Sequence, residues 1–301
     1  MPVLGVLAMV FLLGFGFGQA FLASVPAGNA STTTRVQYQF EKTLPPPVAT
    51  IAAYVVMDEA TGEVLLAQAE DRLLPTASVA KLLVAGVALT SADVFATTTI
   101  TVGDVATEED FGGLAAGDVY SLRELLVPYL LESSNDAGAA IRRTWGAELT
   151  VGLEALLRGT GTTDDVSLAE YNGLSPETKA TARALATLTR TLAVEQPQLF
   201  DITMLSRYVG HTTTLTNNSP VHAVAGYQGG KHGYTEAAGR TLVARMETPF
   251  ADGERTLIYV ILGGTSQATD LATLTDLTAA HVTRIPQATT TSVILSAPTN
   301  E

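Results

Sequence analysis

A serine and a lysine, Ser78 and Lys81, lie one helical turn apart at the start of an apolar stretch. From Val79 to Leu89, every residue except Lys81 and Gly86 is alanine, valine or leucine. A helix that is apolar on all sides is a buried helix, and residues three positions apart share one of its faces. A buried lysine usually lowers its pKa and loses its proton, and a neutral amine can accept the proton of a serine hydroxyl. The stretch therefore predicts a nucleophilic serine with a lysine base, although Ser-x-x-Lys is short enough to occur by chance.

Two later stretches extend this pattern in chain order, Ser133-Ser134-Asn135 and Lys231-His232-Gly233. Taken alone, Ser133 and Asn135 would be assigned as helix caps, a common position for serine and asparagine. Lys231 alone would be assigned as a solvated charge on a strand. In this order, however, the three stretches resemble the S-x-x-K, S-x-N and K-T/S-G motifs of the serine penicillin-recognising enzymes.

The flanking residues narrow the resemblance to the D-alanyl-D-alanine carboxypeptidases of the S11 family. It covers about Pro47 to Val282 and is carried by residues 74–81, 131–137, 172–174, 181–183 and 230–239. The resemblance implies an α/β (α+β) fold of the β-lactamase/transpeptidase-like type, in which helices flank an antiparallel sheet and form an all-helical lobe. It also implies an enzyme that trims peptidoglycan stem peptides, is inhibited by β-lactams and uses no metal or cofactor.

The resemblance further implies a role for each motif residue. Ser78 would attack the carbonyl of a D-Ala-D-Ala bond, with Lys81 as the general base. Ser133 and Asn135 would relay the proton of the leaving group and hold Lys81. Lys231 would attract the substrate carboxylate, and the backbone N–H groups of Ser78 and Tyr234 would form the oxyanion hole. The predicted substrate-binding residues are Lys231, His232, Gly233, Tyr234 and Thr235.

Two departures from the family pattern affect the same function, recognition of the substrate carboxylate. His232 stands where the family usually has threonine or serine, and an imidazole is larger and titrates near neutral pH. Residues 263–270, after the last predicted strand, hold no basic residue, although many family members carry an arginine there. A catalytically weak peptidoglycan-binding or β-lactam-sensing protein and a DD-endopeptidase therefore stay open as alternatives. The spacing of Glu170 and Asn172 disfavours a class A β-lactamase.

The composition limits other classes of function. A formal net charge of −13 over 301 residues argues against nucleic acid as a partner, because no basic stripe is present to neutralise phosphates. The chain has no cysteine, which excludes disulfides, thiol catalysis and cysteine-bound metals. Its four histidines do not show the spacing of a metal-binding motif.

The chain is predicted to have four parts. Residues 1–27 form a membrane anchor or signal segment. The nearly unbroken apolar stretch from Val3 to Val25 has the length of a membrane-spanning helix of about 20 residues, which favours an uncleaved anchor. Residues 28–47 are rich in serine, threonine and proline and form a linker. The catalytic domain spans 48–284, and 285–301 form a flexible tail. We expect an extracytoplasmic domain in the cell envelope, held at the cytoplasmic membrane by the N-terminal helix.

The periodicity of the catalytic domain changes twice along the chain. Two strands are followed by a block of helices, then by three strands and a last helix. This order predicts one sheet assembled from both ends of the domain, with helices packed on it. The predicted strands are 51–58, 63–69, 228–234, 241–247 and 256–262, and the predicted helices are 78–89, 122–131, 136–145, 149–157, 178–193 and 269–282.

Overall fold

The computed structural model describes residues 31–33, 38–106, 111–210, 213–286 and 292–294. The chain divides into two units. The larger one runs from Tyr38 to Pro286, and in the smaller one β1 (Ser31–Thr33) pairs antiparallel with β16 (Ser292–Ile294). The predicted anchor, residues 1–27, lies outside the described residues. Among the helices that are described, none is long and apolar enough to cross a membrane.

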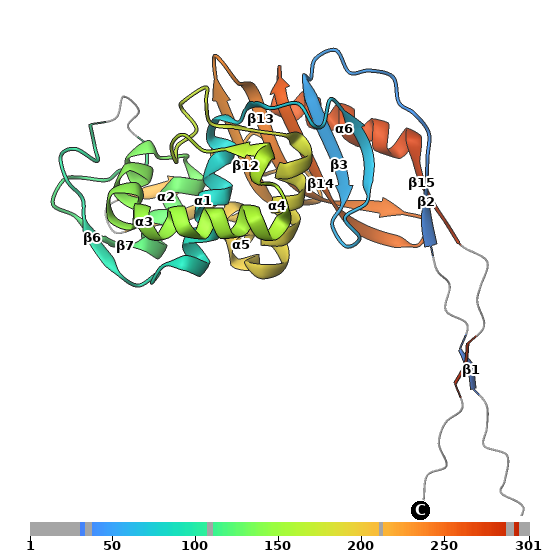
Figure 1. Cartoon of the computed structure of the whole chain (residues 1–301), viewed down its shortest axis with the longest axis horizontal. Helices are drawn as coiled ribbons and strands as arrows, with labels where there is room; N and C mark the ends of the chain where they lie inside the picture. Colours follow the sequence, from blue (N-terminus) through green and yellow to red (C-terminus); the bar gives the residue numbers. More distant parts are fainter. Residues whose placement is uncertain (1–30, 34–37, 107–110, 211–212, 287–291, 295–301) are drawn as a thin grey trace, which may run out of the picture. The chain divides into compact units, whose positions relative to one another are not determined.

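The larger unit is built on a five-stranded antiparallel sheet with the strand order β12-β13-β14-β3-β4 (Figure 1). Strands β3 and β4 come from the start of the domain, and the other three come from near its end. The prediction of one sheet assembled from both ends is therefore confirmed. The strands are β3 (Ala53–Asp58), β4 (Val64–Gln68), β12 (Tyr227–Thr235), β13 (Gly239–Phe250) and β14 (Gly253–Gly264).

Helices cover both faces of this sheet (Figure 1). Helix α6 (Gln267–His281) packs on one face, and the other helices pack on the opposite face and form a helical lobe beside it. Every residue of α1 from Ala80 to Ala88 is buried, as its all-apolar sequence predicts. The predicted fold class is thus confirmed. The other helices are α1 (Ala80–Ser91), α2 (Leu122–Leu131), α3 (Asn135–Thr160), α4 (Ala182–Glu195) and α5 (Pro197–Met204).

The side chains of the central strands alternate between two hydrophobic cores, because successive residues of a strand point to opposite faces. On β3, Val55 and Met57 belong to the core on the side of the helical lobe. Tyr54 and Val56 belong to the core beneath α6. Since both faces are covered, these strands are apolar at nearly every position instead of at every second one.

Short strands and turns tie the loops and the chain ends to this framework. β2 lies within the predicted linker, and β15 extends into the predicted tail, so the compact unit reaches from Tyr38 to Pro286. The short pairs and triplets are β2 (Tyr38–Lys42) with β15 (Val282–Pro286), β5 (Leu74–Pro75) and β8 (Val166–Ser167) with β9 (Lys179–Ala180), β6 (Thr97–Thr99) with β7 (Val119–Ser121), and β10 (Arg207–Val209) with β11 (Thr214–Thr216).

The predicted helix 178–193 begins only at Ala182, because Lys179 and Ala180 form strand β9. Apart from this boundary, the helical lobe differs from the prediction in two places. Two helices are predicted at 136–145 and 149–157, but α3 runs through both without a break. A glycine inside a helix, here Gly146, costs only about 1 kcal/mol, and the buried Trp145 and Leu149 on either side outweigh it. The second difference is α5, which the prediction missed. It follows α4 directly and has Pro197 at its first position. Proline is tolerated there because the N–H that it lacks would have no partner within the helix.

Candidate active site

Ser78 lies in a 3₁₀ turn, η1 (Ala77–Val79), that leads directly into α1. Ala77 has a φ of +46°, which is unusual for a residue with a side chain. Two glycines approach this turn from either side. A Cβ on Gly173 would lie 1.9 Å from the carbonyl oxygen of Ala77, and one on Gly233 would lie 2.6 Å from the backbone nitrogen of Ser78. Only glycine allows backbone segments to come this close, so both motif glycines are explained by packing against the serine.

Lys81 is completely buried one helical turn after Ser78. Its Nζ donates to the backbone carbonyl and the Oγ of Ser133, the latter at 3.2 Å, and to Oδ1 of Asn135 at 2.8 Å. The amine also lies 5.4 Å from the centre of the Tyr129 ring. The first and second motifs therefore meet at the lysine amine, as the resemblance implies.

The loop between α2 and α3 presents both of these partners. Ser133 has a φ of +65°, which turns the chain sharply before α3 begins. The cap of α3 is Ser134, whose Oγ accepts a hydrogen bond from the N–H of Ala137 at 3.1 Å. Because Ser134 takes the capping role, the side chains of Ser133 and Asn135 are available to Lys81. Ser134 is therefore the cap of α3, and the interpretation of Ser133 and Asn135 as caps, which follows when they are taken alone, is wrong.

Lys231 extends from β12, the edge strand of the sheet, and is 1% exposed. Burial lowers the pKa of its amine to about 7. Its Nζ donates to the backbone carbonyl of the next residue, His232, at 2.8 Å. With this one neutral acceptor among the described residues, the buried amine has further donor capacity for a ligand.

His232 is partly buried beside three basic groups. Burial is the main reason that its pKa falls to about 2, and the charges of Lys231, Arg240 and Lys81 lower it further. The imidazole is therefore neutral at any physiological pH. Among the described residues, the charges that act on the ring are all positive.

The rest of the predicted substrate strand shows two different environments. Tyr234 is 55% exposed, and its ring stacks on the guanidinium of Arg240, 4.2 Å from the ring centre. Thr235 takes part in the hairpin turn, where its Oγ1 accepts from the N–H of Ala238 at 3.1 Å. The carbonyl of Gly233 accepts a hydrogen bond from Nε2 of Gln267 at 3.0 Å.

A loop after α3 closes the site on a third side. The Oγ of Ser78 donates to the carbonyl of Asn172 at 3.3 Å, and Nδ2 of Asn172 donates to the carbonyl of Asn135 at 3.2 Å. Glu170 organises this loop, since its carboxylate accepts from the N–H groups of Asn172 at 2.6 Å and Ser175 at 3.1 Å. Both carboxylate oxygens are thus engaged by their own loop, which argues further against a glutamate that activates water.

Arg240 is not among the predicted site residues. The sequence has no basic residue at 263–270, after the last strand, but Arg240 lies opposite Tyr234 in the register of β12 and β13. The hairpin turn between the two strands is short enough for this pairing to be read from the sequence around Thr235 and Gly239. A basic residue on the neighbouring strand therefore lies beside the strand that carries the predicted substrate-binding residues.

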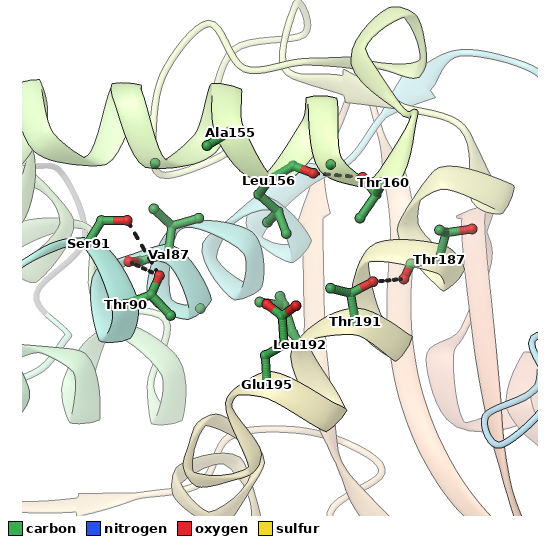
Figure 2. A pocket seen from close by; sticks show the side chains of 13 residues that line it. Val87, Thr90, Ser91, Ala155, Leu156, Thr160, Thr187, Thr191, Leu192 and Glu195 are labelled. Atoms are coloured by element: carbon green, nitrogen blue, oxygen red, sulfur yellow. Dashed lines mark hydrogen bonds between the residues drawn. The ribbon is translucent and has the colours of Figure 1, made fainter. Parts of the chain in front are cut away.

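A separate groove of about 530 Å³ lies toward the C-terminal end of α1, between α3 and α4 (Figure 2). The hydroxyls of Thr160 and Thr191 bond to carbonyls of their own helices. Among the described residues that line it, Glu195 alone is ionisable. The described residues that line this groove include no lysine that could act as a base beside a serine, as Lys81 can beside Ser78. In the part of the chain that the structure describes, no cluster of three or more histidine, aspartate or glutamate side chains could hold a metal ion.

Comparison with known proteins gives a consistent result. Residues 41–266 match the family of D-alanyl-D-alanine carboxypeptidases, Peptidase S11. The chain is 29% identical over 230 residues to the D-alanyl-D-alanine carboxypeptidase DacB2 of Mycobacterium tuberculosis, covering 73% of this chain and 77% of that protein. It is 28% identical over 237 residues to DacD of Salmonella typhimurium, covering 73% of this chain and 60% of that longer protein. A crystal structure of a D-alanyl-D-alanine carboxypeptidase from Mycobacterium tuberculosis is similar with a TM-score of 0.69 at 27% identity, covering 79% of this chain and 94% of that one.

Proposed function

The chain belongs to the D-alanyl-D-alanine carboxypeptidase family of serine peptidases, and we propose that it removes the terminal D-alanine of peptidoglycan stem peptides through an acyl-enzyme on Ser78. The observation that carries this proposal is the environment of Lys81. A completely buried amine sits one turn from Ser78 and donates to both Ser133 and Asn135. A buried lysine is costly unless a function or a full set of partners compensates for it.

The acylation step follows from this arrangement. Once Lys81 has lost one of its three protons, its lone pair accepts the hydroxyl proton of Ser78 while Oγ attacks the carbonyl of the penultimate D-alanine. The negative charge that develops on the carbonyl oxygen is stabilised by the N–H groups of Ser78 and Tyr234. The proton then passes through Ser133 to the amine of the leaving D-alanine as the C–N bond breaks. Water later hydrolyses the ester and restores the hydroxyl of Ser78.

Recognition of the terminal carboxylate falls to Lys231 and Arg240. Lys231 is buried with a pKa of about 7, and a bound carboxylate would favour its charged form. Arg240 is held over the ring of Tyr234 and is close enough to His232 for its charge to lower the pKa of that ring. Lys231 is the lysine of the third motif itself, and Arg240 takes the place of the arginine that many family members carry after the last strand.

The proposal is tested by following D-alanine release from a diacetylated Lys-D-Ala-D-Ala tripeptide. The wild-type protein should release D-alanine, and Ser78→Ala should not, while its thermal unfolding stays nearly unchanged. Release that persists in Ser78→Ala would refute the role of this serine.

A second candidate is a penicillin-binding DD-endopeptidase or a peptidoglycan-binding protein with little carboxypeptidase turnover. The observation that favours it is His232, an uncharged and bulky ring among the cations that would hold the carboxylate. The same assay separates the two functions, because this candidate would acylate with penicillin yet release almost no D-alanine from the tripeptide.

We propose in addition that residues 1–27 anchor the protein in the cytoplasmic membrane, with the catalytic unit outside the cytoplasm. The support is the apolar stretch from Val3 to Val25, together with a family whose substrate belongs to the cell wall. The full-length chain should stay with membranes after an alkaline wash. A mature protein that begins within residues 23–31 would instead demonstrate a cleaved signal.

A further inference from the structure

The side chain of Gln267, on α6, contacts β12, the strand that carries the predicted substrate-binding residues. Gln267 is the first residue of α6, is 5% exposed, and donates through Nε2 to the carbonyl of Gly233 at 3.0 Å. Gly233 is the glycine whose Cα packs against the backbone nitrogen of Ser78. The contact therefore connects α6 to the point where the strand meets the nucleophile.

The hydrogen bond from Gln267 also affects the N–H group of the same peptide unit. The carbonyl of Gly233 and the N–H of Tyr234 belong to the same peptide group, which is planar and trans, so the two point in opposite directions. A donor that fixes the carbonyl on one side fixes the direction of the N–H on the other side. That N–H is one of the two donors expected to stabilise the oxyanion.

The start of α6 is itself held firmly. Oδ2 of Asp270 accepts from the N–H groups of Thr265 and Ser266 at 2.8 and 2.9 Å, and Oδ1 accepts from the hydroxyl of Thr50 at 3.0 Å. The hydroxyl of Ser266 caps the helix by accepting from the N–H of Thr269. Gln267 thus extends from a rigid helix terminus and can act as a fixed support.

We propose that Gln267 is a positioning residue, which orients the Gly233–Tyr234 peptide so that the N–H of Tyr234 faces the attacked carbonyl. This inference rests on the proposed function, since it assigns Gln267 to the acyl-transfer step of that site. An amide whose carbonyl accepts a hydrogen bond is also more polarised, which strengthens its N–H as a donor.

Gln68 provides a matched control in the same sheet. It is a glutamine on the other edge strand, β4, and its Nε2 donates to the carbonyls of Val48 at 3.1 Å and Ile51 at 2.8 Å. Both glutamines therefore tie a loop or strand to the framework through backbone carbonyls. Only the partner of Gln267 shares its peptide group with an N–H at the site.

The test compares Gln267→Met with Gln68→Met after acylation by a penicillin. Both variants should unfold at a lower temperature than the wild type. Gln267→Met should also lower the acylation rate constant on the order of 10-fold, less than the roughly 100-fold or more that follows complete loss of an oxyanion donor. Isotope-edited infrared spectra of its acyl-enzyme should show the ester carbonyl at a higher frequency, because a hydrogen bond to that carbonyl lowers its stretching frequency. Gln68→Met should change neither quantity.

Gln267→Glu keeps the shape of the side chain but, when ionised, presents an acceptor to the Gly233 carbonyl. It should therefore also lower the acylation rate constant and raise the frequency of the ester carbonyl. An unshifted ester band in both Gln267 variants would overturn the positioning role and leave the proposed function intact. The absence of any ester band in the wild-type protein would refute the proposed function and this inference with it.

Discussion

Gly173→Ala tests whether the nucleophile turn depends on its close contact with the loop after α3. A Cβ at this position would lie 1.9 Å from the carbonyl oxygen of Ala77, although real Cβ atoms essentially never approach closer than 3.0 Å. The loop and the turn must therefore separate by about 1.1 Å, the difference between these two distances. A displacement of about 1 Å at a reacting group costs on the order of 100-fold in rate. We expect the acylation rate constant to fall by roughly this factor.

The variant also places alanine at a φ of +77°, which costs roughly 1–3 kcal/mol of stability on its own. Gly161→Ala separates this strain from the displacement, because Gly161 has a φ of +69° and no atom within 4 Å of its added Cβ. Stopped-flow acylation with a fluorescent penicillin and thermal unfolding should be measured for both variants. Gly161→Ala should lose stability but acylate normally. Near-normal acylation in Gly173→Ala would refute the claim that this contact positions Ser78.

Three further predictions concern the basic groups of the site. Lys81→Arg should fold but acylate several orders of magnitude more slowly, because a guanidinium cannot lose its proton at ordinary pH; a near-normal rate would show that Lys81 is structural. The pKa of Lys231 is lowered to about 7, below its value of 10.5 in the unfolded chain, so the unfolded state binds more protons between these values and wild-type stability should rise with pH there. Lys231→Met should abolish this rise, which amounts to roughly 2 kcal/mol between pH 7.5 and 9.5 in chemical denaturation, and an unchanged slope would contradict the burial of a neutral amine. His232→Thr should raise kcat/KM for D-Ala-D-Ala peptides. Any dependence of kcat/KM on pH near 6.5 in the wild type should persist in this variant, since the imidazole is neutral with a pKa of about 2. If the substitution removed such a dependence, the histidine would be shown to work as a cation.

Much of the fold could be predicted because its signals are local. The alternation of the strands and the apolar run of α1 depend only on spacing along the chain. The length of α3 could not be predicted in this way, because the burial of Trp145 and Leu149 that carries it through Gly146 depends on tertiary packing. Helix α5 was missed because it has only 8 residues and shares Gln196 as a cap with the end of α4, so little sequence separates the two helices.

The candidate site shows the same division. Ser78, Lys81, Ser133, Asn135 and Lys231 could be named because their types and order form a pattern. The structure brings Lys81 together with Ser133 and Asn135, and it places Gly233 against the backbone of Ser78. Arg240 and Gln267 could not be found by motif, because each reaches the site from an element outside the three motifs. The pKa of His232 depends on burial and on three neighbouring charges, which no sequence pattern reports.

The central claim is that Ser78 becomes acylated, and mass spectrometry after incubation with benzylpenicillin tests it most directly. Opening of the β-lactam ring adds the whole inhibitor to the nucleophile, so the intact protein should gain the mass of one penicillin molecule. Peptide mapping should place this mass on Ser78, and Ser78→Ala should gain none. A wild-type protein that stays unmodified, or an adduct on another residue that persists in Ser78→Ala, would contradict the account.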